Sequence, residues 1–96
     1  MGEIRNTVIA RADEIKGLLA KRHALTIKVF GSVARGEDRE ESDVDFLVEF
    51  GPGASILDQV NLELDLRALL NCEVDVVPVG GLKDRDAHIL AEAVSL

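Results

Sequence analysis

The segment from Gly31 to Phe50 constrains the fold of this 96-residue chain more than any other part of it. A Gly-Ser pair follows a short apolar run, and after an acidic loop a second run begins at Asp43. Side chains alternate between the two faces of a strand, so Asp43 and Asp45 share one face, with their Cα atoms about 6–7 Å apart. Both carboxylates can therefore reach one divalent cation or two neighbouring ones. The Gly31-Ser32 corner can receive phosphate through backbone N–H groups, so the segment indicates phosphoryl or nucleotidyl transfer.

The composition indicates one small globular domain over residues 1–96. Hydrophobic residues make up 47% of the chain and charged residues 30%, which is typical of a folded protein with a single core. The net charge of −7 argues against direct binding of nucleic acid, since no basic stripe is present to contact phosphates. The same charge fits a protein that binds a metal ion, a nucleotide through that ion, or a basic partner.

The cellular setting is indicated by what the chain lacks. Cys72 is the single cysteine, so an internal disulfide is impossible and a reducing, cytoplasmic compartment is expected. The first residues lack the apolar stretch of a secretory signal. No apolar run approaches the ~20 residues that span a bilayer, so we expect no membrane association.

The hydrophobic periodicity predicts helical segments and strands in the order α-β-α-β-α-β-α. The predicted strands are Thr26–Phe30, Asp43–Phe50 and Glu73–Val77, and the helical segments are 3–23, a turn that Ser32 caps, 55–70, and Asp84 or Asp86 to Val94. The expected inward side of helix 55–70 is Ile56, Leu57, Val60, Leu64, Leu66, Leu69 and Leu70, and that of the last helix is Ala87, Leu90, Ala91 and Val94. The charged loop from Glu37 to Ser42 is expected to lie in solvent.

Each predicted strand has an apolar face and a face that carries charge. This pattern predicts an α+β fold with a three-stranded mixed sheet, helices on one face and the other face open. The second strand should run antiparallel to the first and parallel to the third, which returns through a right-handed crossover. Asp75 then falls beside Asp43 and Asp45. Three converging carboxylates repel one another unless a cation neutralises them, and an all-oxygen set favours Mg²⁺ or Mn²⁺ over Zn²⁺.

Two stretches of the chain carry a family resemblance: G-S-V-A-R-G at 31–36 and, after five intervening residues, S-D-V-D-F-L-V at 42–48. Together they resemble the signature G-S-x-A-R-G…S-D-x-D-[LF]-x-V of the minimal nucleotidyltransferases, the MNT proteins of the DNA polymerase beta superfamily. The strand Glu73–Val77 lies where that family has its third carboxylate, and the resemblance covers nearly the whole chain. It implies the nucleotidyltransferase fold.

The resemblance also implies a role for each matching residue. Asp43 and Asp45 would bind two Mg²⁺ ions that bridge the triphosphate of ATP, and Asp75 would complete this metal site and help to deprotonate the attacking hydroxyl. Gly31 and Ser32 would hold the terminal phosphates. For Arg35 two roles remain open, a phosphate contact and a structural ion pair with the acidic loop.

MNT proteins pair with HEPN-domain ribonuclease toxins, so the resemblance implies an antitoxin that transfers AMP to a tyrosine of such a toxin in a hetero-oligomer. The chain has no tyrosine or tryptophan, and at this size no second domain to supply an acceptor, so the acceptor should come from a partner. One alternative is an antitoxin that neutralises its partner by binding alone. Another is a nucleotidyltransferase with a small-molecule acceptor.

Overall fold

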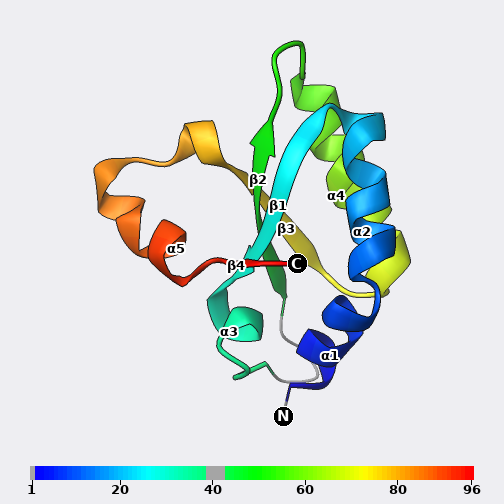
Figure 1. Cartoon of the computed structure of the whole chain (residues 1–96), viewed down its shortest axis with the longest axis vertical. Coiled ribbons are helices and arrows are strands. Elements are labelled where there is room, and N and C mark those ends of the chain that lie inside the picture. Colours follow the sequence, from blue (N-terminus) through cyan, green and yellow to red (C-terminus); the bar gives the residue numbers. More distant parts are fainter. Residues whose placement is uncertain (1, 39–42) are drawn as a thin grey trace.

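The computed structural model describes residues 2–38 and 43–96 (Figure 1). The predicted loop positions 39–42, including Ser42 of the motif, lie outside the described residues. The elements are α1 (Glu3–Ala10), α2 (Ala12–Leu19), β1 (Ala24–Phe30), α3 (Gly31–Ala34), β2 (Val44–Phe50), α4 (Ile56–Leu70), β3 (Val74–Pro78), α5 (Ala87–Glu92) and β4 (Val94–Ser95), with 3₁₀ turns at Ala20–Arg22, Val79–Gly81 and Asp84–Asp86.

The strands form one mixed sheet in the order β3-β2-β1-β4. As predicted, β1 pairs antiparallel with β2, and β2 pairs parallel with β3. The prediction of three strands was wrong, because Val94 and Ser95 pair antiparallel with Val29 and Lys28 of β1 and add a fourth strand. Helix α5 ends at Glu92 because Ala93 is extended, with φ −66° and ψ 135°, and this turns the chain onto the free edge of β1.

The N-terminal segment bends where a single helix was predicted. Arg11, with φ −105° and ψ 17°, separates α1 from α2. Hydrogen bonds continue across the bend, from Arg11 N–H to Thr7 O and from Ile15 N–H to Arg11 O. The predicted apolar side also continues, since Val8 and Ile15 are both fully buried. Periodicity therefore carries through the bend and could not reveal it.

Asp38 overturns the expectation that the whole charged loop lies in solvent. Its side chain is only 2% exposed, and its Oδ2 accepts a hydrogen bond of 2.9 Å from Ile4 N–H. Ile4 stands in the first turn of α1, where backbone N–H groups lack helical partners and favour a negative charge. This hydrogen bond connects the loop after α3 to the first turn of α1.

Helix α4 begins with the predicted capping box, in which Ser55 and Asp58 each accept a backbone N–H from the other, and it ends at Asn71 in the left-handed region with φ +54°. Its buried residues are Leu62, Leu66 and Leu70. The predicted inward side was therefore wrong in part, since Ile56, Leu57, Val60 and Leu64 are exposed. Leucines occur all round this helix, so periodicity alone could not decide which side faces the sheet.

The layers of the molecule also differ from the prediction of helices on one face. Figure 1 shows α2 and α4 on one side of the sheet and α5 on the other. Leu47 points to the face that was expected to be open, yet it is only 2% exposed, and Leu90 of α5 lines a hollow with it. The predicted apolar side of the last helix was wrong as well, because Ala87, Leu90, Ala91 and Val94 are all exposed.

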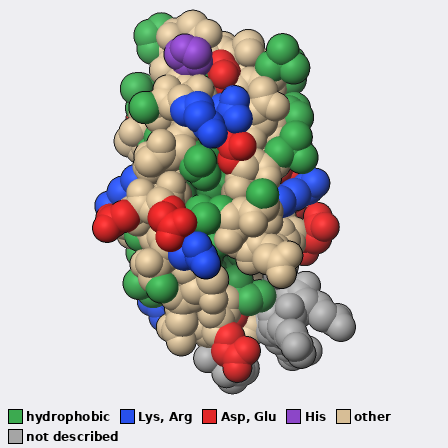
Figure 2. Space-filling model, turned by 90° about the vertical axis from the view of Figure 1, so that its right-hand side faces the viewer, with side chains coloured by type: hydrophobic (Ala, Val, Ile, Leu, Met, Phe, Trp, Pro, Cys, Tyr) green, Lys and Arg blue, Asp and Glu red, His purple; other side chains and the backbone are tan. Residues whose placement is uncertain are grey.

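The helical side of the molecule is shown in Figure 2, where basic and acidic side chains lie next to one another. Among the ion pairs of α4, the guanidinium of Arg22 binds Asp65 with a distance of 2.7 Å between Nε and Oδ2. This pairing holds the pKa of Asp65 below its usual value. Within residues 2–38 and 43–96, no helix is long and apolar enough to cross a bilayer.

Candidate active site

Asp45 and Asp75 lie side by side on neighbouring parallel strands. Their Cα atoms are register partners in the pairing of β2 with β3, so the two side chains project from the same face of the sheet. Asp43 directly precedes β2, two residues before Asp45, and is exposed like Asp75. The prediction that the third strand brings Asp75 next to Asp45 is confirmed.

Burial and the charges of the neighbouring acids change the pKa of Asp45. Burial is the largest cause that raises the pKa of Asp45, followed by the negative charges of Asp75, Asp43 and Glu92, while the guanidinium of Arg35 acts in the opposite direction. Asp45 is half-buried, so solvent screens these charges less than it would on an open surface. A cation placed here would relieve the repulsion and favour the ionised carboxylate.

Gly31 brings the predicted phosphate corner against these carboxylates. Its φ of +75° lies in the left-handed region, and a Cβ atom at this position would collide with Oδ2 of Asp45. The α3 turn begins at Gly31, with Phe30 as N-cap, so the prediction that Ser32 caps it was wrong. Gly36, with φ +71°, ends the turn as predicted, and Glu37 N–H returns to Ser32 O at 2.9 Å. The half-buried Ser32 thus stands in the first turn of α3, one residue after Gly31.

Arg35 binds acidic groups on two sides. Its Nε donates to Oε2 of Glu37 at 3.0 Å, and an Nη atom donates to Oε2 of Glu92 at 3.1 Å. The hydrogen bond with Glu37 is the largest cause that raises the pKa of Arg35. Of the two roles left open by the sequence, the structure contains the ion pair with the acidic loop, through Glu37.

Glu92 is a residue of the site that sequence reasoning missed. Its Oε1 accepts a hydrogen bond of 3.0 Å from Gly31 N–H, across 61 positions of the chain. It comes from α5, the helix on the face that was expected to be open. The sequence held one signal, an acid in the otherwise small and apolar stretch Ala91–Val94; nothing in periodicity could connect it to Gly31.

A metal ion would have to share its ligands with a substrate at this site. Among the described residues, no group of three or more His, Cys, Asp or Glu side chains is already arranged to hold a metal ion. Mg²⁺ seldom needs such a group, because it binds one or two carboxylates and completes its shell with water and substrate phosphates. The carboxylates of Asp45 and Asp75, next to the Gly31 corner, fit that arrangement, and their oxygens suit Mg²⁺ or Mn²⁺.

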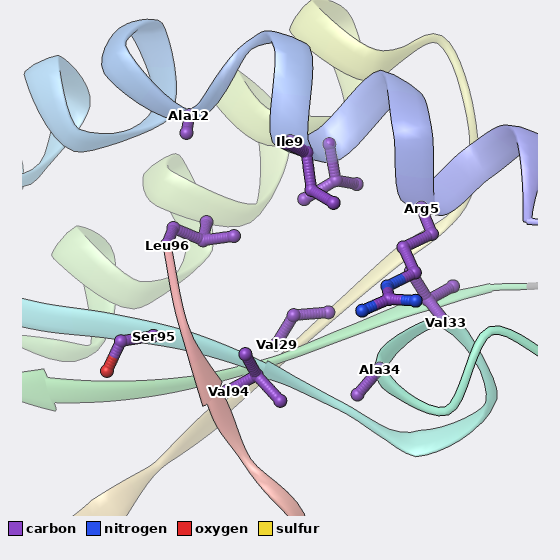
Figure 3. A pocket seen from close by; sticks show the side chains of 10 residues that line it. Arg5, Ile9, Ala12, Val29, Val33, Ala34, Val94, Ser95 and Leu96 are labelled. Carbon is purple, nitrogen blue, oxygen red and sulfur yellow. The ribbon is translucent and has the colours of Figure 1, made fainter.

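A separate cavity of about 160 Å³ lies between α1, β1 and β4. Figure 3 shows Leu96 and Ile9 reaching into the space between the helices and the strands, with Arg5 at one end. Its lining is mostly aliphatic and contains no carboxylate side chain. This cavity therefore suits an apolar group better than a phosphate.

Comparisons with known proteins identify the family and the relatives of this chain. Residues 13–95 match the family described as polymerase beta, nucleotidyltransferase. A "putative protein adenylyltransferase" of Methanocaldococcus jannaschii is 46% identical over 83 residues, which cover 82% of this chain and 86% of the relative. The protein adenylyltransferase MntA of Thermococcus cleftensis is 41% identical over 93 residues, which cover 96% of this chain and 91% of the relative.

Solved structures extend the similarity to the fold. A structure described as a "putative minimal nucleotidyltransferase" has a TM-score of 0.87 and 44% identity, covering 96% of this chain and 95% of the other. A toxin–antitoxin complex with AMP-PNP has a TM-score of 0.70 at 22% identity, over 84% of this chain and 67% of the other. A tri-AMPylated HEPN toxin of Shewanella oneidensis in complex with an MNT antitoxin gives a TM-score of 0.55 at 20% identity, over 86% of this chain and 60% of the other.

The family match over most of the chain, the relatives above 40% identity and the convergence of Gly31, Asp45 and Asp75 lead to one conclusion. The chain belongs to the polymerase beta nucleotidyltransferase family and is similar to its minimal nucleotidyltransferases.

Proposed function

We propose that this nucleotidyltransferase transfers AMP from ATP to a hydroxyl of a HEPN-type ribonuclease toxin and so acts as its antitoxin, with tyrosine as the acceptor that we favour. The observation that carries the proposal is the position of Asp45 beside Asp75 and against the Gly31 corner. The names of the relatives support protein adenylyl transfer. The toxin–antitoxin complexes that share the fold support a toxin as the acceptor.

Each residue of the site has a separate role in the proposed reaction. Asp43 and Asp45 would hold two Mg²⁺ ions, which supply charge neutralisation of the triphosphate and of the leaving pyrophosphate. Asp75 completes the carboxylate set and accepts the proton of the attacking hydroxyl, for which its exposed position leaves an approach from solvent. The backbone N–H groups at Gly31 and Ser32 hold the terminal phosphates.

The acceptor is proposed to come from a partner. The chain contains no tyrosine, so it cannot modify itself at the residue type that we favour. A hetero-oligomer with the toxin would place the acceptor hydroxyl over the exposed Asp75. We place the reaction in the cytoplasm, where ATP is available, and expect no direct role for nucleic acid at a net charge of −7.

The test is transfer of label from α-labelled ATP to a co-purified HEPN-domain partner in the presence of Mg²⁺. We expect label on the partner with the native chain and none with the double variant Asp43→Asn, Asp45→Asn. The matched control is Glu49→Gln, which changes an exposed acid on the same strand and face, four residues beyond Asp45. This control should label the partner normally.

The same variants separate catalysis from neutralisation by binding. If the double variant still neutralises the ribonuclease, occupancy alone suffices and AMP transfer is not the antitoxin mechanism. If label appears on a small molecule while the partner protein remains unlabelled, the acceptor class proposed here is wrong.

A further inference from the structure

Glu92 occupies the position at which the Gly31 corner would receive an anion. The carboxylate accepts the Gly31 N–H at 3.0 Å, and its two oxygens accept an Arg35 Nη atom at 3.3 and 3.1 Å. A backbone N–H together with a guanidinium is the donor set that proteins use for phosphate oxygens. The chain therefore supplies, from its own α5, an anion that meets the same two donors.

We propose that Glu92 is an intramolecular competitor for the nucleotide triphosphate, which must displace its carboxylate from Gly31 and Arg35 in order to bind. The proposal rests on the proposed function, because it concerns the phosphate corner of that site. The proposal adds Glu92, which is 61 positions from Gly31 in the chain, as a residue that sets nucleotide affinity. The corner then exists in a closed form, with Glu92 bound, and an open form that accepts the triphosphate.

Two further observations make displacement physically reasonable. Little burial stabilises the segment that carries Glu92. Helix α5 has six residues and no buried residue, and the neighbouring strand β4 has only two residues. The contact is also accessible, because the side chains of Arg35 and Glu92 are 46% and 28% exposed. An ion pair of this exposure contributes little to stability, so a triphosphate with Mg²⁺ can replace it.

Glu92 also adds negative charge where a nucleotide brings more. Its carboxylate lies within electrostatic range of Asp45, together with Asp43 and Asp75. A triphosphate that entered with Glu92 in place would meet four carboxylates around one corner. Displacement of Glu92 removes one of these charges and frees the Gly31 N–H and Arg35 in the same step.

The test is calorimetric titration of ATP, and separately of tripolyphosphate, into the full chain and its variants, without Mg²⁺ and with it. We expect Glu92→Ala to bind both ligands about tenfold more tightly, as when an open form populated to about a tenth becomes the only form. Glu92→Gln should show a smaller gain, since the amide oxygen can still accept the Gly31 N–H, while the negative charge that pairs with Arg35 is lost. If Glu92→Ala does not fold, the titration of Glu92→Gln tests the proposal by itself.

The matched control is Glu37→Gln. Glu37 is the other acid bound to Arg35, at 3.0 Å from Nε, and its contact with Arg35 does not involve the Gly31 N–H. Affinity in this control should stay close to the native value. An equal gain in Glu37→Gln would overturn the proposal, because the effect would then come from general loss of negative charge. Unchanged or weaker binding in the Glu92 variants would overturn it as well.

The outcomes also separate this proposal from the proposed function. If ATP binds none of the variants, nor the native chain, both fail together. If ATP binds the native chain but no more tightly to the Glu92 variants, the competitor proposal alone fails. A second measurement does not depend on affinity: saturating ATP should increase hydrogen exchange in the native chain over residues 87–95, and increased protection there would contradict displacement.

Discussion

The carboxylate of Asp45 lies against the Cα of Gly31, in the space that a side chain at position 31 would fill. Gly31 also has a φ of +75°, so its lack of a side chain is required by the backbone and by the neighbouring strand at once. The contact joins the corner proposed to bind phosphate to the strand that carries the carboxylates proposed to bind metal. The two halves of the site therefore cannot shift independently.

Gly31→Ala should destabilise the protein and damage nucleotide binding together. The left-handed backbone alone costs about 1–3 kcal/mol for a residue with a side chain, and the new methyl group would push Asp45 away from its position. Urea unfolding and calorimetric titration of ATP measure the two effects. The control is Gly17→Ala in α2, where nothing lies within 4 Å of an added Cβ; it should stabilise the protein by about 0.5–1 kcal/mol. Equal unfolding free energies for both variants would contradict the argument.

Asp45→Asn should abolish AMP transfer yet raise the thermal midpoint at neutral pH. Because the folded state raises the pKa of this carboxyl above its ordinary value of 3.8, the ionised form is penalised in the folded protein. That penalty is fully present above the folded-state pKa and vanishes as the pH falls below 3.8. The midpoint should rise by about 4–8 °C for each ~1 kcal/mol of relieved repulsion.

Circular dichroism melts from neutral pH into the acid range measure this difference. The difference in thermal midpoint between Asp45→Asn and the native chain should become smaller as the pH falls. A variant that is less stable than the native chain at neutral pH would show that the carboxylate is held by favourable contacts, contrary to the repulsion inferred here.

Mg²⁺ with ATP should raise the thermal midpoint of the native chain. Ligands that bind only the folded state stabilise it by mass action, by about 2.7 kcal/mol at a concentration of 100 times Kd. A chelator should remove the part of the shift that depends on the metal. Persistence of the full shift in the double variant Asp43→Asn, Asp45→Asn would place the nucleotide elsewhere on the protein.

Leu66→Ala and Leu64→Ala test which side of α4 faces the sheet. Leu66 is fully buried, whereas Leu64 is 53% exposed. The first substitution should cost about 2–5 kcal/mol because it leaves a cavity in the core, and the second should change the free energy of unfolding by less than about 0.5 kcal/mol. Urea unfolding of both variants provides the comparison, and similar losses would mean that both sides of α4 are packed.

The parts of the fold that local pattern controls could be predicted. Alternation from Val44 to Phe50, interrupted only by the apolar Leu47, indicates which side chains share a face, and a helical crossover predicts the parallel direction of β3. These two facts are enough to bring Asp75 beside Asp45. The capping box at Ser55 was equally readable, because it depends only on contacts between residues three positions apart.

The remaining features depend on tertiary contacts that leave no periodic trace. A two-residue strand such as Val94–Ser95 is too short to alternate, and the bend at Arg11 leaves the apolar side continuous. Asp38 and Glu92 look like solvated acids in the sequence, yet each accepts a backbone N–H from a distant element. For both residues, the partner and not the local sequence decides the environment.

The contact between Glu92 and Gly31 also bears on the order of events during folding. It closes a loop of 61 positions, while α1, α2 and the β1–β2 pair form from contacts much nearer in the chain. Loop closure disfavours such distant contacts early in folding, so the Gly31 corner should form before Glu92 reaches it. At the binding site proposed above, a chain that folds in the presence of ATP would therefore meet the nucleotide while the corner is still open.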